Sequence, residues 1–500
     1  MVKKNINEKH YTYIMTDLET IVKELHQLYE NDAYMSSKLQ QYIYELPTLL
    51  KQLKTTYDEK VSRTNEISIE QQQFVSNFLN NNYYFYNNLT EKFFHYDKVH
   101  YTSVSEDDVL YHILSSITQE NSCLVSWKQK TKVHIVKKIK DKSLVKYAPE
   151  STTIQFILNL LNPFFYSKTA VKYFLTILGD SILKKNTQPL YHFMDSKCKS
   201  FLRELNGLCY FYIGGNMIQT IKHKYHDHNY SMCRFVKIND NIQNDALWKP
   251  VLEKSIDLFC VACHYSNRYQ SSDHYLMNFS NDMDLISSVM YLKDKTKEDV
   301  VQLFFAEYIQ IVDTDNNPTM SISWKNMLYL WKSFLENKGL PTIMFQDHLK
   351  EILMSRASVH CINDEFLGWT SKYLPMIQLF IDFWERHIDE HSSIDTELEI
   401  EEICVLFKRY NRMREPIPDK QIIGILTYFF PHIEIFSDKY IYGISCDLWK
   451  KDLEIEYIFE RNPELREKDI DEQYLAYCQY YSKKEEPLLV SKSYFESKYK

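Results

Sequence analysis

Apolar residues recur at helical spacing along most of the chain. The first example lies in residues 11–30 (YTYIMTDLETIVKELHQLYE), where one face would carry Ile14, Leu18, Ile21, Val22 and Leu25. Similar patterns continue to about residue 90, with an interruption at Pro47 and a further helix that starts at Ser68 and runs through NNNYYFYNN. We therefore expect residues 1–90 to form an N-terminal helical arm or bundle.

A few short segments show the spacing of β-strands instead. Residues 93–101 alternate around an Asp-Lys turn, which predicts a small hairpin near residues 93–104. The segment CRFVKIND at 233–240 also has the pattern of a strand. Long helical patterns dominate the remainder, so we expect a mainly α fold with minor β and several domains.

Changes of pattern divide the chain into four parts. After the arm of residues 1–90 we expect an α-rich domain with small β elements at 91–245, and then a helical core domain at 246–390. Residues 391–500 would form a C-terminal module, either winged-helix-like or a plain helical pair. The acidic stretch IDEHSSIDTELEIEEI would link core and module, with its charges solvated.

Composition removes several classes of function. The chain has only 8 glycines in 500 residues, where about 7% Gly, or roughly 35, is typical. It contains neither a glycine-rich phosphate loop ending in Gly-Lys-Ser/Thr nor the common hydrolase and metalloprotease motifs, so we expect no ATP binding and no conventional enzyme. The bias towards Lys, Asn, Ile and Tyr is what AT-rich codons produce.

Net charge and hydropathy restrict the partners and the cellular compartment that we expect. A net charge of -8 excludes a globally basic nucleic-acid coat but not a local basic patch. We find no window of about 18 apolar residues, so we expect no membrane contact. The N-terminus carries no apolar signal core. The ten cysteines are mostly unpaired in spacing, so we expect a reducing cytosolic compartment. In such a compartment, clusters of Cys and His would indicate metal sites or core packing before disulfides.

One basic run is the candidate nucleic-acid contact. The segment SWKQKTKVHIVKKIKDKSLVK has a single carboxylate, no arginine and a partial apolar stripe. Lysine contacts phosphate as a point charge, so binding here would be largely independent of sequence, with Trp127 and His134 as neighbours for stacking. A solvated helix face is the alternative. The candidate residues are Lys128, Lys130, Lys132, Lys137, Lys138, Lys140 and Lys142, followed by Lys146.

Two Cys/His stretches form a candidate metal site. Cys260 and Cys263 share one helical face, so both thiolates could reach one ion, and upstream residues would supply the other pair. Zinc is the metal that such donors favour. The alternative is that the cysteines fill a core and HKYHDH is a polar turn. The candidate ligands are His226, His228, Cys233, Cys260, Cys263 and His264.

A second, weaker metal candidate is the segment DTDNNP. Asp313 and Asp315 could hold Mg²⁺ together with substrate phosphates. An Asp/Asn/Pro-rich turn between two helices needs no such role, so both interpretations stay open.

Several stretches together resemble a protein family of nucleocytoplasmic large DNA viruses, of the mimivirus kind, from about residue 75 to 500. They are SEDDVLYHILSSIT, PESTTIQ, KYFLTILGD, KYHDHNYSMCR, CVACHYS and SISWKNMLYLWK. The resemblance brings no activity with it. A remoter likeness is to the poxvirus-type primase-helicases with a superfamily-3 core. MDSKCKS at 194–200 would stand at their phosphate loop, keeping Lys197 and Ser200 without any glycine, which implies a relative unable to use ATP.

These observations lead to three functional hypotheses. The first is a non-enzymatic accessory protein of viral DNA replication or transcription, which binds DNA or RNA and other viral proteins in the virus factory of the host cytoplasm. The second is a structural or scaffold protein of the virion or factory. The third is a zinc-dependent enzyme acting on nucleic acid.

Overall fold

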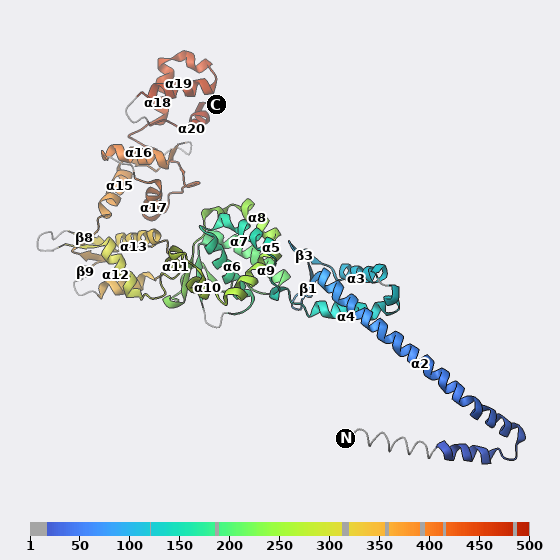
Figure 1. Cartoon of the computed structure of the whole chain (residues 1–500). Helices are drawn as coiled ribbons and strands as arrows, with labels where there is room; N and C mark the ends of the chain where they lie inside the picture. The colour runs from blue at the N-terminus through green and yellow to red at the C-terminus, as the bar shows by residue number, and fades with distance from the viewer. Residues whose placement is uncertain are drawn as a thin grey trace. The chain divides into compact units, whose positions relative to one another are not determined.

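The computed structural model describes residues 18–120, 122–185, 190–312, 320–355, 360–390, 396–413, 417–483 and 488–499. The protein is mainly helical with small sheets, as the sequence predicts (Figure 1). It divides into two compact units. Unit 1 comprises residues 1–188, 196–220 and 237–286, and unit 2 comprises residues 189–195, 221–236 and 287–500. We describe each unit by itself.

Unit 1 begins with residues 18–28 in a helix, followed by the 49-residue helix α2 (Ala33–Asn81). The Asp32 side chain starts α2 by accepting hydrogen bonds from the N–H groups of Tyr34 and Met35. The sequence interpretation of a break at Pro47 and a new helix at Ser68 is wrong, because α2 runs through both. A proline removes one backbone hydrogen bond, and here the helix is exposed to water.

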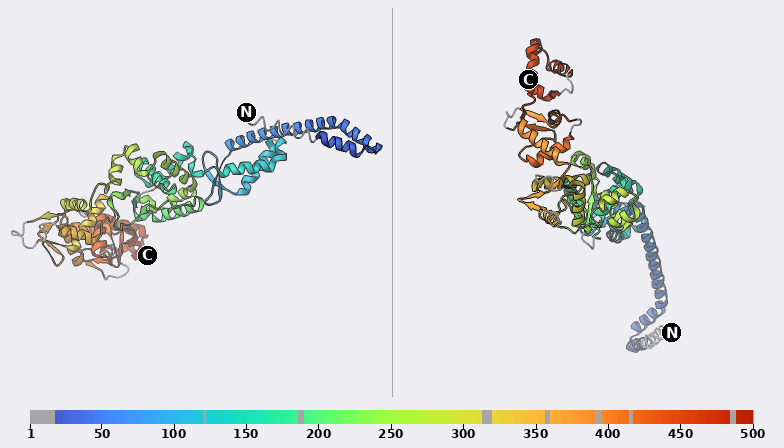
Figure 2. Two further views of the ribbon diagram at one scale, coloured as in Figure 1. Left: turned by 90° about the horizontal axis from the view of Figure 1, so that it is seen from below. Right: turned by 90° about the vertical axis from the view of Figure 1, so that its left-hand side faces the viewer.

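The end of α2 packs on a small sheet and two helices. Strands β1 (Tyr83–Asn87), β2 (Lys92–Tyr96) and β3 (Tyr101–Val104) form an antiparallel sheet in that order. The expected hairpin is confirmed, but Tyr83–Asn87 pairs with β2 instead of extending the helix. Helices α3 (Glu106–Glu120) and α4 (Lys128–Lys140) complete this core. α2 runs well beyond the part that packs here (Figures 1 and 2).

The remainder of unit 1 is a helical layer around two buried helices. Helix α6 (Lys168–Ile182) packs along α9 (Ser255–Tyr269), and both are buried on almost every face. The helices α5 (Ser151–Leu161), α7 (Lys199–Tyr212), α8 (Asp245–Glu253) and α10 (Ser272–Phe279) contact this pair. The hairpin is tied to α9 by Asp257, which accepts hydrogen bonds from the His100 ring (2.7 Å) and the Tyr101 N–H (2.6 Å).

Unit 2 contains a parallel sheet and a helical core. Strands β4 (Tyr191–Met194), β5 (Ile221–Lys222) and β6 (Cys233–Val236) pair in the order β5-β4-β6, which confirms the strand expected at CRFV. The α11 helix (Met283–Val289) leads into this unit. The core helices are α12 (Lys297–Tyr308), α13 (Trp324–Lys338), α14 (Gln346–Met354), α15 (Leu374–His387), α16 (Ile400–Tyr410) and α17 (Asp419–Phe429).

Short antiparallel strands connect these helices. One sheet has the order β8-β10-β9, and three further pairs are β7 with β11, β12 with β15, and β13 with β14. Their bounds are β7 Gln310–Ile311, β8 Ser321–Ser323, β9 His360–Ile362, β10 Glu365–Leu367, β11 Trp369–Thr370, β12 Ile388–Asp389, β13 Glu397–Glu399, β14 Tyr440–Tyr442 and β15 Ser445–Cys446.

The C-terminal end of unit 2 is helical. It consists of α18 (Lys451–Arg461), α19 (Ile470–Tyr481) and α20 (Lys492–Tyr499). The described residues between α19 and α20, which include 488–491, contain no strand where a winged-helix pattern would place one. The acidic stretch is not the expected linker with solvated charges. It supplies β12, β13 and the start of α16, and it buries Glu399 and Glu402.

Candidate functional sites

Helix α4 turns most of its lysines away from its buried residues, whereas Lys132 is half-buried on the same side as Ile135 and Ile139. Thr131, Ile135 and Ile139 are buried, and the Thr131 hydroxyl accepts a hydrogen bond from the buried Gln71 amide at 2.9 Å. That buried stripe fixes the rotation of α4 about its axis. Lys130, Lys137, Lys138 and Lys140 are consequently exposed to solvent.

Some of the candidate lysines are engaged within unit 1. Lys128 donates to the Thr118 hydroxyl at 2.7 Å, and Lys142 donates to the Leu79 carbonyl at 3.3 Å. Lys140 lies 3.8 Å from Glu106. Within the described part of the chain, Lys132, Lys137 and Lys138 form no ion pair with a carboxylate. We name the exposed residues Lys130, Lys137 and Lys138 the lysine face.

The lysine face is a region of uncompensated positive charge. The pKa of Lys142 is lowered, first by burial and then by the positive charge of Lys138 nearby. The ammonium of Lys130 lies 3.8 Å from the centre of the Trp127 ring, so this indole is covered by a cation and is less open to stacking than the sequence suggested. The face is therefore suited to phosphate groups.

The downstream half of the predicted metal site lies in the core of unit 1. Cys260 and Cys263 are fully buried on α9. Burial raises the pKa of both thiols, and the neighbouring Cys209 acts on Cys263 in the same direction. His264 is half-buried, and burial followed by the positive charge of Arg268 lowers the pKa of its ring. The thiols of Cys260 and Cys263 are therefore protonated at neutral pH when no metal is bound.

The upstream half of the site belongs to unit 2. The His226 N–H donates to Nδ1 of His228 at 3.0 Å, and the His228 ring packs against Tyr191 and Phe193. The buried Cys233 thiol donates to the Asn229 carbonyl at 3.2 Å. The two halves thus lie in different units. The described residues contain no group of three or more His, Cys, Asp or Glu side chains arranged to hold a metal. Zinc binding stays a prediction.

The sequence also suggested a Mg²⁺ site at DTDNNP and a degenerate phosphate loop at MDSKCKS. Asp313 and Asp315 lie outside the described residues. Lys197, at the position of the expected phosphate loop, pairs with Asp240 at 2.7 Å. Along the chain, β4 is followed by a short 3-10 helix (Ser196–Cys198) and then by α7, which is the order of elements around a phosphate loop.

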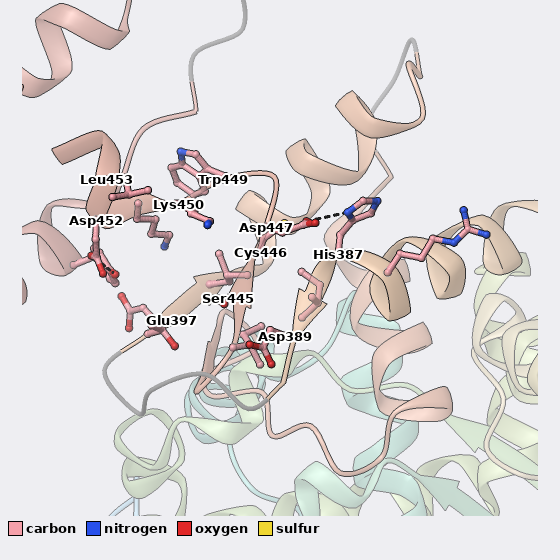
Figure 3. Close-up of a pocket in the computed structure, with 17 residues that line it drawn as sticks. His387, Asp389, Glu397, Ser445, Cys446, Asp447, Trp449, Lys450, Asp452 and Leu453 are labelled. Atoms are coloured by element: carbon pink, nitrogen blue, oxygen red, sulfur yellow. Dashed lines mark hydrogen bonds and ion pairs between the residues drawn. The ribbon is translucent and has the colours of Figure 1, made fainter. Parts of the chain in front are cut away.

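Sequence reasoning missed a cavity of about 590 Å³ in unit 2 (Figure 3). Its walls are the ends of β12, β13 and β15, the first turn of α18, and Tyr494. Figure 3 shows Glu397, Lys450 and Asp452 on one side of Cys446, with His387 and Asp447 on the other. Both signs of charge line the cavity, so it suits a small polar ligand.

Lys451, which forms part of this wall, belongs to a buried ion pair with Glu402. Lys451 Nζ lies 2.6 Å from Glu402 Oε2, and their side chains are 4% and 6% exposed. Burial raises the pKa of Glu402, and the charge of Lys451 opposes that shift. Lys451 also lies over the Tyr494 ring, 4.6 Å from its centre. The pair thereby joins α18 and α20 to α16.

The residues that line the cavity include one cysteine, Cys446, and one histidine, His387. Burial raises the pKa of Cys446, so its thiol is not an activated nucleophile. His387 Nδ1 meets Asp447 Oδ1 at 2.9 Å, and the Asp447 N–H donates to the His387 carbonyl, so this pair closes the β12–β15 ribbon. Glu399 and Glu402 form a capping box at the start of α16, a pattern that marks a helix start in a sequence but does not reveal a cavity.

No protein-family profile matches the chain, and comparisons with curated proteins and with solved structures find no match. Among the described residues, no helix is both long enough and apolar enough to cross a membrane. The functional argument therefore depends on the sequence and on the geometry.

Proposed function

We propose that the chain is a non-enzymatic protein that binds DNA or RNA through the lysine face of α4. The observation that carries the proposal is that the exposed Lys130, Lys137 and Lys138 form no ion pair with a carboxylate among the described residues, in a chain whose net charge is -8. Neighbouring lysine ammonium groups repel one another when no carboxylate lies between them. Bound phosphate groups would offset that repulsion.

The chemistry of lysine sets the expected specificity. An ammonium contacts phosphate oxygens without reading base edges, and α4 contains no arginine for bidentate contacts to guanine. Binding would release counterions and would weaken steeply as salt rises. We therefore propose a positioning or accessory role with little sequence preference.

The family resemblance supplies the setting for this role. We propose that the chain serves replication or transcription of a large DNA virus in the host cytoplasm, as a relative of primase-helicases that does not use ATP. The order of β4, the short helix and α7 supports that relation, and the pairing of Lys197 with Asp240 together with the missing glycines supports the loss of ATP binding.

Fluorescence anisotropy with labelled single-stranded DNA, duplex DNA and RNA tests the proposal. We expect salt-sensitive binding that Lys137→Glu with Lys138→Glu weakens at least tenfold. Lys51→Glu with Lys54→Glu, at two exposed positions of α2, makes the same change of net charge and serves as the control. Equal weakening by both pairs would show that only overall charge matters, and no binding by the unmodified protein would refute the proposal.

A scaffold role is the second candidate. The specific observation in its favour is a row of exposed apolar side chains along α2.

A further inference from the structure

The outer part of α2 exposes a continuous apolar stripe. Its central leucines, Leu46, Leu49 and Leu53, are 49%, 47% and 66% exposed. Single exposed leucines are common on protein surfaces, whereas a contiguous exposed apolar patch marks an interaction site. The stripe, as we use the term below, consists of the half-buried Leu39 and of seven exposed residues, Tyr42, Ile43, Leu46, Leu49, Leu50, Leu53 and Tyr57.

The spacing of the stripe is that of helices packed against helices. Leu39, Tyr42, Leu46, Leu49 and Leu53 follow one another at alternating intervals of three and four residues, which are the a and d positions of a heptad. Ile43, Leu50 and Tyr57 add an apolar e position to each heptad. Three apolar positions per heptad are wider than a two-stranded seam, so the stripe suits a bundle of more than two helices.

The helix of residues 18–28 carries the same pattern. Leu18, Ile21, Leu25 and Leu28 occupy a and d positions, and Val22 occupies an e position. Leu18, Ile21, Val22 and Leu28 are exposed. Residues 29–32 turn this helix back into α2 (Figure 1). Each chain therefore supplies two amphipathic helices with uncovered apolar faces, which is half of a four-helix bundle.

We propose that the stripe binds the stripe of a second copy of this chain, with the two α2 helices antiparallel. In the alignment centred between Pro47 and Thr48, Leu46 of one copy meets Leu49 of the other. Tyr42 then meets Leu53 of the second copy, so apolar side chains fill successive layers. This inference does not rest on nucleic-acid binding by α4.

The charges beside the stripe select this alignment. The g positions hold Lys38, Glu45, Gln52 and Glu59. In the antiparallel alignment, Lys38 lies opposite Glu59 of the second copy, and Glu45 lies opposite Gln52 of the second copy. A shift by one heptad would place Glu45 against Glu45 of the second copy, and a parallel pair would place these polar groups against the apolar e positions. Both alternatives are less favourable.

On the opposite side of this seam, the e positions of α2 provide a surface that the helix of residues 18–28 could cover. There, Ile43 would lie opposite Leu50 of the second copy, which leaves an apolar row beside the two α2 helices. The exposed faces of the two 18–28 helices are apolar, as that row is. They would cover it, whereas the charged g side would face water.

Sedimentation equilibrium of the full chain under reducing conditions tests the association. We expect a mass of about twice 60.2 kDa for the unmodified protein. Leu46→Asp with Leu49→Asp should weaken association at least tenfold, because carboxylates would enter the central layers. These positions are exposed in the single chain, so folding should survive, as circular dichroism would show. Tyr44→Asp is the matched control, since Tyr44 is 90% exposed and lies outside the stripe.

Charge reversal tests the alignment. Lys38→Glu should weaken the dimer by opposing Glu59 of the second copy, and adding Glu59→Lys should restore it. Restoration would not occur in a parallel dimer. A chain that stays monomeric, as it would if its own residues 1–17 or a different protein covered the stripe, would overturn the proposal. A dimer that tolerates both aspartates would overturn it as well.

Discussion

Gly179 of α6 touches the backbone of Ala262 of α9 so closely that no side chain fits between them. A Cβ atom at Gly179 would overlap the Ala262 carbonyl oxygen and would press on Ser266 Cβ. The small residues of the CVACHYS segment thus serve close helix packing. We expect Gly179→Ala to lower the free energy of unfolding by about 1–3 kcal/mol or more, because the two helices must separate. Urea denaturation measures this change.

Gly424 is the matched opposite case. It also lies inside a helix, α17, but a Cβ there would meet only the Tyr329 hydroxyl at 3.7 Å. Glycine in a helix interior costs about 0.5–1 kcal/mol relative to alanine. Gly424→Ala should therefore stabilise the protein by roughly that amount in the same denaturation experiment. A loss of stability would mean that the space beside Gly424 is not free.

The buried pair of Lys451 and Glu402 should behave as a coupled unit. Lys451→Met alone would leave a buried carboxylate unpaired, and we expect a loss of about 3–5 kcal/mol. Adding Glu402→Gln should recover most of that loss, because the amide oxygen can still accept the Glu399 N–H that Glu402 accepts now, at 2.8 Å. A double-mutant cycle measures the coupling.

The exposed pair of Lys338 and Glu307 provides the control for that cycle. Lys338 Nζ lies 2.7 Å from Glu307 Oε1, but the side chains of Lys338 and Glu307 are 33% and 43% exposed. Lys338→Met should change stability far less, since solvent screens the pair. Equal costs at Lys338 and Lys451 would show that burial is not the source of the coupling.

Periodicity in the sequence predicted the elements that depend on local pattern. It identified the helix at Lys128–Lys140, the hairpin and the strand at Cys233–Val236, because burial on one face leaves a repeating signature. It failed at Tyr83–Asn87, whose aromatic residues fit a helix end as well as a strand until β2 provides a partner. Pro47 misled for a different reason, since one lost hydrogen bond does not end a long solvated helix.

The site residues depended on contacts that no local pattern encodes. Glu402 looks like one carboxylate in a solvated acidic run, and only the chain 49 residues later supplies the lysine that buries it. The Cys and His residues looked like neighbours because they are close in sequence, yet the fold assigns them to separate units. By contrast, the lysine face could be predicted in outline, because charges on one helix need no distant partner to stay exposed.

Thiol labelling distinguishes the two interpretations of the cysteines. Cys123 is exposed, whereas burial raises the pKa of the Cys209 and Cys233 thiols to about 12 and also raises that of Cys260 and Cys263. We expect N-ethylmaleimide to modify Cys123 first in the native protein, with the buried thiols reacting only after unfolding. Peptide mass spectrometry locates the labels. Labelling of Cys260 and Cys263 that begins when a chelator is added would instead support the predicted zinc site.

His228 should make unit 2 less stable in acid. Burial against its aromatic neighbours lowers the pKa of the ring below 6.5, and the positive charges of His226 and Lys222 lower it further, against the opposing charge of Asp227. The unfolded chain then binds a proton more readily than the folded one, so the stabilisation is present above about pH 6.5 and is lost as pH falls below it.

Replacing His228 by phenylalanine tests this sign directly. His228→Phe removes the proton site and also the acceptor for the His226 N–H, so the variant starts from a lower melting temperature at neutral pH. Its melting temperature should nevertheless fall less steeply than that of the unmodified protein between about pH 7 and pH 5. The slope is the informative quantity, because the variant lacks the proton site and the hydrogen bond at every pH, whereas the unmodified protein loses that bond as Nδ1 of His228 takes up a proton. Two parallel curves would contradict the assignment to His228.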